Sequence, residues 1–190
     1  METELDTPAL VMADDSRRDG QMERSFRYST PEALFRAEHE KLVKALVLVA
    51  DGDREAARDA VQEGYVQLCL NWKKVREYED ASAWVRRVAI NRLRNQQRSY
   101  RRGLRAVSRL AGERAPAESS APPTQDLRRE RVLAALKALP ERQRTAAALY
   151  YVADLSVAEV ARSMGVREGS VKTHLSRARE TLKSLLEDER

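Results

Sequence analysis

The chain has 190 residues, enough for one domain or two small ones. Hydrophobic residues make up 42% and charged residues 34%, as in globular proteins, and the 5% aromatic content predicts thin, aliphatic, helical cores. The net charge of +5 favours a polyanionic partner. Since no stretch approaches the roughly 18 apolar residues of a membrane span and no signal peptide opens the chain, we expect a cytoplasmic protein without membrane insertion.

The N-terminal part of the sequence predicts three helices. Residues 1–30 are polar and irregular, and we expect them to form a disordered extension. A helix then begins near Pro31, capped by Ser29 or Thr30, and ends at the Asp51-Gly52 pair. A second helix runs from about Asp53, and a third, around Trp84, either continues or bends near Asn91.

The C-terminal part predicts four further helices after a linker. Residues 103–126 lose the helical pattern and contain three prolines, as a flexible linker does. Helical spacing returns over residues 127–139 and 142–152, and then over the stretch 157–186. No strand pattern occurs. The predicted fold class is therefore all-α, with two small helical domains at 31–102 and 127–190.

The last stretch reads as a helix-turn-helix. Ser156 and Glu159 form an S-x-x-E capping box, and Gly165 follows where a tight turn needs positive φ. Ala161 is small enough for a second helix to approach closely. That second helix has an apolar stripe and, opposite it, donors suited to base edges and phosphates. These donors include Arg167, Ser170, Lys172, Thr173, Ser176 and Arg177. The alternative is an ordinary solvated face on a surface helix.

A second candidate nucleic-acid surface lies between Arg86 and Arg105. This segment contains eight arginines and no acidic residue, with Tyr78, Trp84 and Tyr100 flanking or interrupting it. Such runs are usually solvated helix faces, but those normally carry acids at helical spacing. Arginines with exposed aromatics instead suit the binding of unpaired bases. Trp72 is assigned to the core rather than to base stacking.

The sequence offers no catalytic or metal-binding pattern. Cys69 is the only cysteine, so it forms no internal disulfide, and its apolar neighbours predict a buried thiol. His39 and His174 stand alone and far from it. No Ser-His-Asp arrangement, paired carboxylates or Gly-rich phosphate loop is found. We expect no metal, no cofactor and no enzymatic activity.

Two stretches together resemble a known family. The segment "DAVQEGYVQLCLNWKKVREYEDASAWVRRVAINRLRNQQRSYRR" is similar to region 2 of the extracytoplasmic-function (group IV) sigma factors of the sigma-70 family. Its matching features are a D-x-x-Q-E helix, a tryptophan helix, an R-x-A-x-N step and a basic tail. The segment "LKALPERQRTAAALYYVADLSVAEVARSMGVREGSVKTHLSRARETLK" similarly resembles region 4. The resemblance covers most of the chain, in the family's order.

The resemblance implies an alternative sigma factor that binds core RNA polymerase and reads the −10 and −35 promoter elements. Region 2 would bind the β′ clamp through Asp59, Gln62 and Glu63, although ion pairs on a solvated face remain the alternative for these residues. The −10 DNA, melted to single strands, would contact Tyr78, Trp84, Arg87, Asn91, Arg94 and Arg98. Region 4 would sit on the β flap and read −35 duplex through Arg167, Glu168, Ser170, Lys172, Thr173, Ser176 and Arg177. An anti-sigma factor is a further implied partner.

Two departures and two alternatives accompany this interpretation. Gly64 and Tyr65 stand where a larger aliphatic and Phe are commoner, which suggests either close approach of the polymerase or a weak helix. Arg167 replaces a commoner Ser or Pro. A conventional helix-turn-helix regulator would need an upstream α/β domain, for which no strand is predicted. A decoy that borrows the sigma fold would have no use for the basic faces.

Overall fold

The computed structural model describes residues 28–111 and 127–187. The surroundings of side chains are described for 28–100, 102–103 and 133–185. Most of the expected N-terminal extension lies outside the described residues. So does most of the expected linker, residues 112–126. Every regular element in the described ranges is helical, which confirms the all-α prediction. None of the described helices is both long enough and apolar enough to span a membrane.

The N-terminal half consists of three helices, α1 (Pro31–Val49), α2 (Arg54–Val75) and α3 (Ala81–Ala111). Each begins at a side-chain cap. The Thr30 hydroxyl accepts a hydrogen bond from the Ala33 amide, and the Asp53 carboxylate accepts one from the Ala56 amide. Asp80 caps α3 in the same way, at 2.8 Å from the Ala83 nitrogen. The expected start of the first helix at Pro31 is thereby confirmed.

The C-terminal half contains α4 (Leu127–Ala138), α5 (Glu141–Ala147), the π-helical segment η3 (Ala148–Val152), α6 (Val157–Met164) and α7 (Glu168–Glu187). The predicted capping box is present, because Ser156 and Glu159 each bind the other's backbone amide through a side-chain oxygen. Gly165 ends α6 with φ of +67°, the left-handed conformation that the turn requires. The helix-turn-helix prediction is confirmed as a backbone arrangement.

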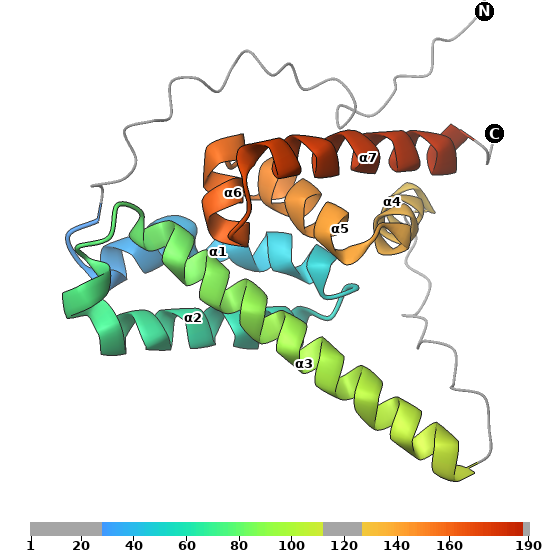
Figure 1. The fold of residues 1–190 in the computed structure, drawn as a ribbon, viewed down its shortest axis with the longest axis horizontal. Helices are drawn as coiled ribbons and strands as arrows, with labels where there is room; N and C mark the ends of the chain where they lie inside the picture. Colours follow the sequence, from blue (N-terminus) through green and yellow to red (C-terminus); the bar gives the residue numbers. More distant parts are fainter. Residues whose placement is uncertain (1–27, 112–126, 188–190) are drawn as a thin grey trace, which may run out of the picture.

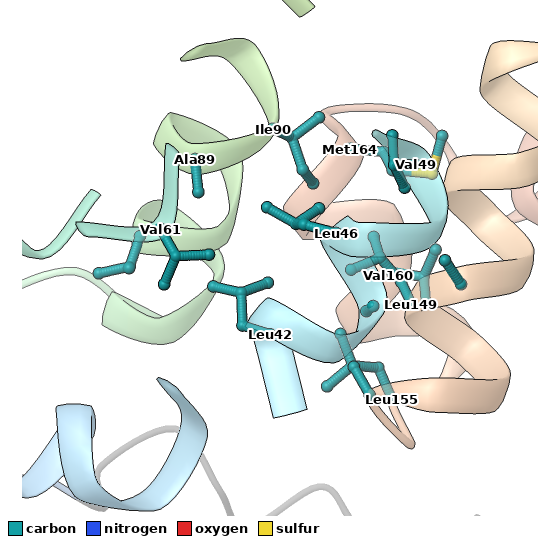
Figure 2. Close-up of a cluster of buried hydrophobic side chains, with 14 of the residues drawn as sticks. Leu42, Leu46, Val49, Val61, Ala89, Ile90, Leu149, Leu155, Val160 and Met164 are labelled. Atoms are coloured by element: carbon teal, nitrogen blue, oxygen red, sulfur yellow. The ribbon is translucent and has the colours of Figure 1, made fainter. Parts of the chain in front are cut away.

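The two halves pack against each other around α1. In Figure 1, α1 lies between the α2–α3 pair and the helices α5 to α7. Figure 2 shows Leu42 and Leu46 of α1 between Ile90 of α3 on one side and Leu149 and Val160 of the C-terminal half on the other. A single hydrophobic cluster therefore spans both halves. The two halves are therefore in direct contact and share one hydrophobic core, in addition to being joined by the linker.

Of the two alternatives for the third helix, the structure shows continuation past Asn91 (Figure 1). Three other local expectations are corrected. The linker was expected to begin at residue 103, but α3 continues to Ala111 because its helical backbone runs on past Gly103. Cys69 is exposed rather than buried, because it lies on the outer side of α2 while its neighbour Leu68 faces the core. Gly64 is buried against α3, so neither polymerase approach nor a weak helix explains it.

The packing of α2 on α3 accounts for Gly64. A Cβ atom placed there would lie 3.2 Å from the backbone oxygen of Val85 and 3.4 Å from Ala89 Cβ. Glycine lets the two helices approach closely, since any side chain would have to push α3 away. The residue thus serves the interior of the N-terminal half.

Candidate nucleic-acid and polymerase interfaces

The front of α7 forms an exposed polar surface, which we name the recognition face. It comprises Arg167, Glu168, Ser170, Lys172, Thr173, Ser176 and Arg177, all of which are exposed. On the opposite side of α7, Val171, Leu175 and Ala178 are buried. The apolar stripe anchors the helix and leaves the first turns of the recognition face open to solvent. A recognition helix needs this orientation, with its first turns exposed, to enter a major groove.

Two side chains of the recognition face already have partners within their own helix. The Thr173 hydroxyl donates to the Gly169 carbonyl at 2.9 Å, and the Ser176 hydroxyl donates to Glu180 at 3.1 Å. Both hydroxyl oxygens can still accept a hydrogen bond. Lys172 is exposed between them, and its ammonium group has three donors to offer. Lys172 therefore offers donors to an outside partner in the first turns, as the exposed Ser170 hydroxyl does.

The electrostatic environment behind the recognition face is positive. Burial lowers the pKa of His174, and the nearby Arg142 and Arg177 lower it further. Neutral His174 thus avoids adding charge beside two arginines. Arg179 is directed toward Tyr151 rather than into the recognition face, since its Nε donates to the Tyr151 hydroxyl at 2.6 Å. Positive charge concentrated on one surface of α7 attracts a polyanion.

Four of the predicted −10 residues lie in one row along α3, which we name the α3 stripe. They are Arg87, Asn91, Arg94 and Arg98, whose spacing of three and four residues places them on one helical face. Arg87, Asn91 and Arg98 are exposed and Arg94 is half-buried. The other two predicted −10 residues flank the row, with Tyr78 38% exposed and Trp84 packed partly into the core.

The arginine run is not a single surface. Arg86 is only 2% exposed, and its guanidinium lies 2.8 Å from Glu38 and 3.6 Å from Asp80. Its Nε also donates to the Ser163 hydroxyl. The sequence showed no acid within the run, yet the compensating carboxylates come from other segments. Arg86 is thus a buried structural cation rather than part of a nucleic-acid face, and Trp72, as expected, packs against the core.

The outer side of α2 carries the predicted polymerase-binding residues. Asp59 and Gln62 are exposed and Glu63 is half-buried, where it accepts a hydrogen bond from Gln67 at 3.0 Å. Two exposed aliphatic side chains continue the same side of the helix, Val66 at 46% and Leu70 at 74% exposure. We name these five residues the α2 face.

The aliphatic part of the α2 face was not predicted. Val66 follows Asp59 by seven residues and Leu70 follows Glu63 by seven, so both repeat the helical register of the polar set. That register is a signal that the sequence does contain. Exposed large aliphatics on a helix that already buries its other side are typical of a protein-binding surface.

The described residues offer little else for chemistry. Among them no group of three or more His, Cys, Asp or Glu side chains is arranged to hold a metal ion. His39 stacks on Phe35 and Tyr65, with ring centroids 4.3 and 6.0 Å away, and so belongs to an aromatic cluster on α1 and α2. The surfaces available for function are therefore the recognition face, the α3 stripe and the α2 face.

Comparison with known proteins identifies the family of both halves of the chain. Residues 35–103 match the family model of sigma-70 region 2, and residues 129–182 match that of sigma-70 region 4. The chain is 30% identical over 159 residues to the ECF RNA polymerase sigma factor SigM of Mycobacterium tuberculosis, covering 82% of this chain and 76% of that protein. It is also 30% identical over 145 residues to EcfG of Rhodopseudomonas palustris, covering 76% and 78% of the two chains.

A solved structure shares the fold. The sigma factor RpoE of Bartonella quintana, crystallised in complex with the anti-sigma factor NepR, superposes with a TM-score of 0.56 at 23% sequence identity. The match covers 82% of this chain and 99% of that one. Family models and relatives agree on the family, and the solved structure agrees on the fold. The chain therefore belongs to the extracytoplasmic-function sigma factors of the sigma-70 family, non-enzymatic subunits that bind core RNA polymerase and direct promoter-specific transcription initiation through −10 and −35 elements.

Proposed function

We propose that the three surfaces divide the work of this sigma factor. The α2 face binds the β′ clamp of core polymerase, the α3 stripe holds the melted −10 strand, and the recognition face reads −35 duplex while region 4 sits on the β flap. The observation that carries the proposal is accessibility, because none of the sixteen residues predicted for these roles is buried. Residues chosen from sequence at random would include members of the core.

The α2 face is suited to a protein partner. It combines two carboxylates and an amide at one end with Val66 and Leu70 at the other, and α2 buries its remaining side in the core. Polar groups fix the orientation of a docked partner, and aliphatic groups supply affinity when they are covered. An acidic and apolar face is poorly suited to DNA and suited to a protein, and we assign it to the polymerase.

The α3 stripe and the recognition face are suited to nucleic acid in two different forms. The stripe offers guanidinium groups and an amide in a row, with Tyr78 and Trp84 nearby for stacking on unpaired bases. The recognition face offers short hydroxyls and Lys172 on a helix end that can enter a major groove. Unstacking a base costs about a few kcal/mol, which the pocket that receives it must offset.

The surroundings of the protein follow from the same assignment. Since polymerase and promoter DNA are its partners, the protein acts in the cytoplasm, and an anti-sigma factor is the regulator that this group of proteins implies. The related Bartonella sigma factor was crystallised with such a regulator. Pull-down of the tagged chain from its own host tests this partner, which should be found in complexes that lack core polymerase.

The polymerase assignment is tested with one triple variant. Asp59→Ala, Gln62→Ala and Glu63→Ala together should abolish retention on immobilised core polymerase while circular dichroism stays unchanged, because Asp59 and Gln62 are exposed and Glu63 is only half-buried. Asn71→Ser is the matched control, since Asn71 is exposed on the same helix but lies on another side. Retention of the triple variant at the level of this control would remove the α2 face from the clamp. Run-off transcription from a genomic library then identifies the promoters.

A further inference from the structure

One border of the recognition face is formed by a helix outside the helix-turn-helix. α5 packs against α7, where Ala147 and Ala178 belong to one small apolar cluster. Gln143 and His174 each precede one member of this pair by four residues, so each lies one turn away on the same side of its helix. Both side chains are half-buried. α5 therefore places side chains next to the middle of α7.

Two arginines from these two helices lie close to the His174 imidazole. Arg142 is on α5 and Arg177 is on α7, and both are exposed. Burial is the largest cause of the lowered pKa of His174, and the charges of Arg142 and Arg177 follow. Since a charge shifts a pKa noticeably only at short range, the two guanidinium groups and the imidazole lie together. We name these three residues the α5–α7 cluster.

The α5–α7 cluster contains no negative charge that would balance its arginines. Among the described residues, no carboxylate forms an ion pair with either of them. The acids nearest to them in sequence have other partners, since Glu141 lies 2.6 Å from Arg94 and Glu180 accepts a hydrogen bond from Ser176. Two like charges held near each other repel, so a group that binds between them must be an anion.

The imidazole does not add to this positive charge. His174 Nδ1 is buried and has no hydrogen-bond partner among the described residues. A proton on Nδ1 would find no acceptor, and a buried donor without an acceptor is unfavourable. This agrees with the lowered pKa of His174, which keeps the ring neutral near pH 7. The charge of the cluster is therefore carried by two exposed guanidinium groups.

The two arginines differ in their relation to the recognition face. Arg177 belongs to it, whereas Arg142 lies outside the helix-turn-helix and is brought there by the packing of α5 on α7. A guanidinium group binds phosphate oxygens through two parallel hydrogen bonds, and one phosphate can accept from two such groups. We propose that Arg142 and Arg177 together bind one backbone phosphate of the duplex that the recognition face reads. The assignment rests on the proposed function of that face. Such a contact positions α7 in the groove and carries no sequence information.

The phosphate contact is tested by binding of the full chain to a fluorescent duplex of randomised sequence, because a backbone contact does not depend on the bases. Arg142→Ala should weaken binding about tenfold at low salt, the effect of losing one charge-assisted hydrogen bond. The slope of log affinity against log salt concentration should fall by about one. Arg142→Lys should recover part of the affinity, since it keeps the charge. Arg58→Ala is the control and should leave binding unchanged, because Arg58 is exposed on α2, at the opposite edge of the molecule from α7 (Figure 1).

A double variant decides whether one phosphate is shared. Arg142→Ala combined with Arg177→Ala should lower the slope by about one in total, because a single phosphate is then left without a partner. A fall of about two would show that each arginine holds its own phosphate, which would overturn the shared site. Circular dichroism checks that each variant is folded.

The geometry of the cluster is tested without DNA, by NMR titration of the two histidines of the chain. Arg142→Ala should raise the pKa of His174 toward the ordinary histidine value, because a cation that disfavours the imidazolium is removed. It should leave the pKa of His39 unchanged. Arg58→Ala should do the reverse, since burial and then Arg58 lower the pKa of His39, while Glu40 raises it.

The outcomes distinguish the errors. An unchanged pKa of His174 in Arg142→Ala would show that the cluster does not form, and would overturn the proposal. A raised pKa with duplex binding equal to that of Arg58→Ala would overturn the phosphate site. The same holds if retention on core polymerase falls instead, because the arginine would then bind a protein. Loss of duplex binding in Arg177→Ala alone would refute only the role of Arg142, whereas no loss in either variant would refute the function proposed for the recognition face.

Discussion

The exposed Leu70 side chain offers a sharp test of the α2 face. Leu70 is 74% exposed and belongs to no described hydrophobic cluster, so replacing it with Ser should hardly affect folding. Burying a whole leucine side chain contributes about 1.5–3 kcal/mol. Covering the three-quarters that are still accessible would contribute roughly 1–2 kcal/mol to docking, which corresponds to about a 5- to 30-fold loss of affinity in Leu70→Ser.

The assay is equilibrium binding of labelled chain to purified core polymerase, with circular dichroism as a check on folding. Asn71→Ser is the control, since it introduces the same residue one position along, about 100° around the helix. Val66→Ser should weaken binding less than Leu70→Ser, because Val66 is only 46% exposed and has less surface to cover. Equal affinities of Leu70→Ser and Asn71→Ser would show that the aliphatic part of the α2 face lies outside the polymerase interface.

Three further predictions concern DNA reading and stability. Lys172→Ala should cost roughly 1–3 kcal/mol of binding free energy on the preferred −35 duplex and little on scrambled duplex. Arg177→Ala should weaken binding to both duplexes and lower the slope of log affinity against log salt concentration by about one. Binding titrations at several salt concentrations measure both effects. Equal losses from Lys172→Ala on both duplexes would make it a phosphate contact. Ser156→Ala should lower the free energy of unfolding in urea by about 0.5–2 kcal/mol through loss of the cap, and an unchanged midpoint would contradict this. Gly64→Leu should lower it by about 1–3 kcal/mol by forcing α3 away from α2, so that a fully stable variant would refute the close approach.

The features that the sequence predicted well are those decided by neighbouring residues. A helix start depends on a cap and on the residue three positions later, so the capping box at Ser156 could be recognised directly. The starts near Ser29 or Thr30 and near Asp53 could be placed to within a residue. The left-handed Gly165 likewise follows from a local turn. These signals fixed the existence of the helices in both halves and the accessible side of α7.

The features that the sequence did not predict depend on distant segments. Nothing near Arg86 shows that Glu38 and Asp80 will surround it, and nothing near Cys69 shows which side of α2 the core covers. The contact between the halves is of this kind, since Arg144 meets Asp51 across 93 positions of sequence. Periodicity in the sequence identifies the apolar positions of α1, but it does not show that both the N-terminal and the C-terminal half pack against them.

The two neighbours Arg86 and Arg87 show why composition alone misjudges a basic run. Both lie in α3, yet one is buried among carboxylates and the other is exposed at the contact between the halves. Arg87 and Arg94 of the α3 stripe have charge-assisted partners in the C-terminal half, a carbonyl oxygen and a carboxylate. Arg98, one turn further along, is exposed. The same residue type along one helix therefore serves the interior, a contact between the halves or an exposed row, depending on which distant segments pack against each position.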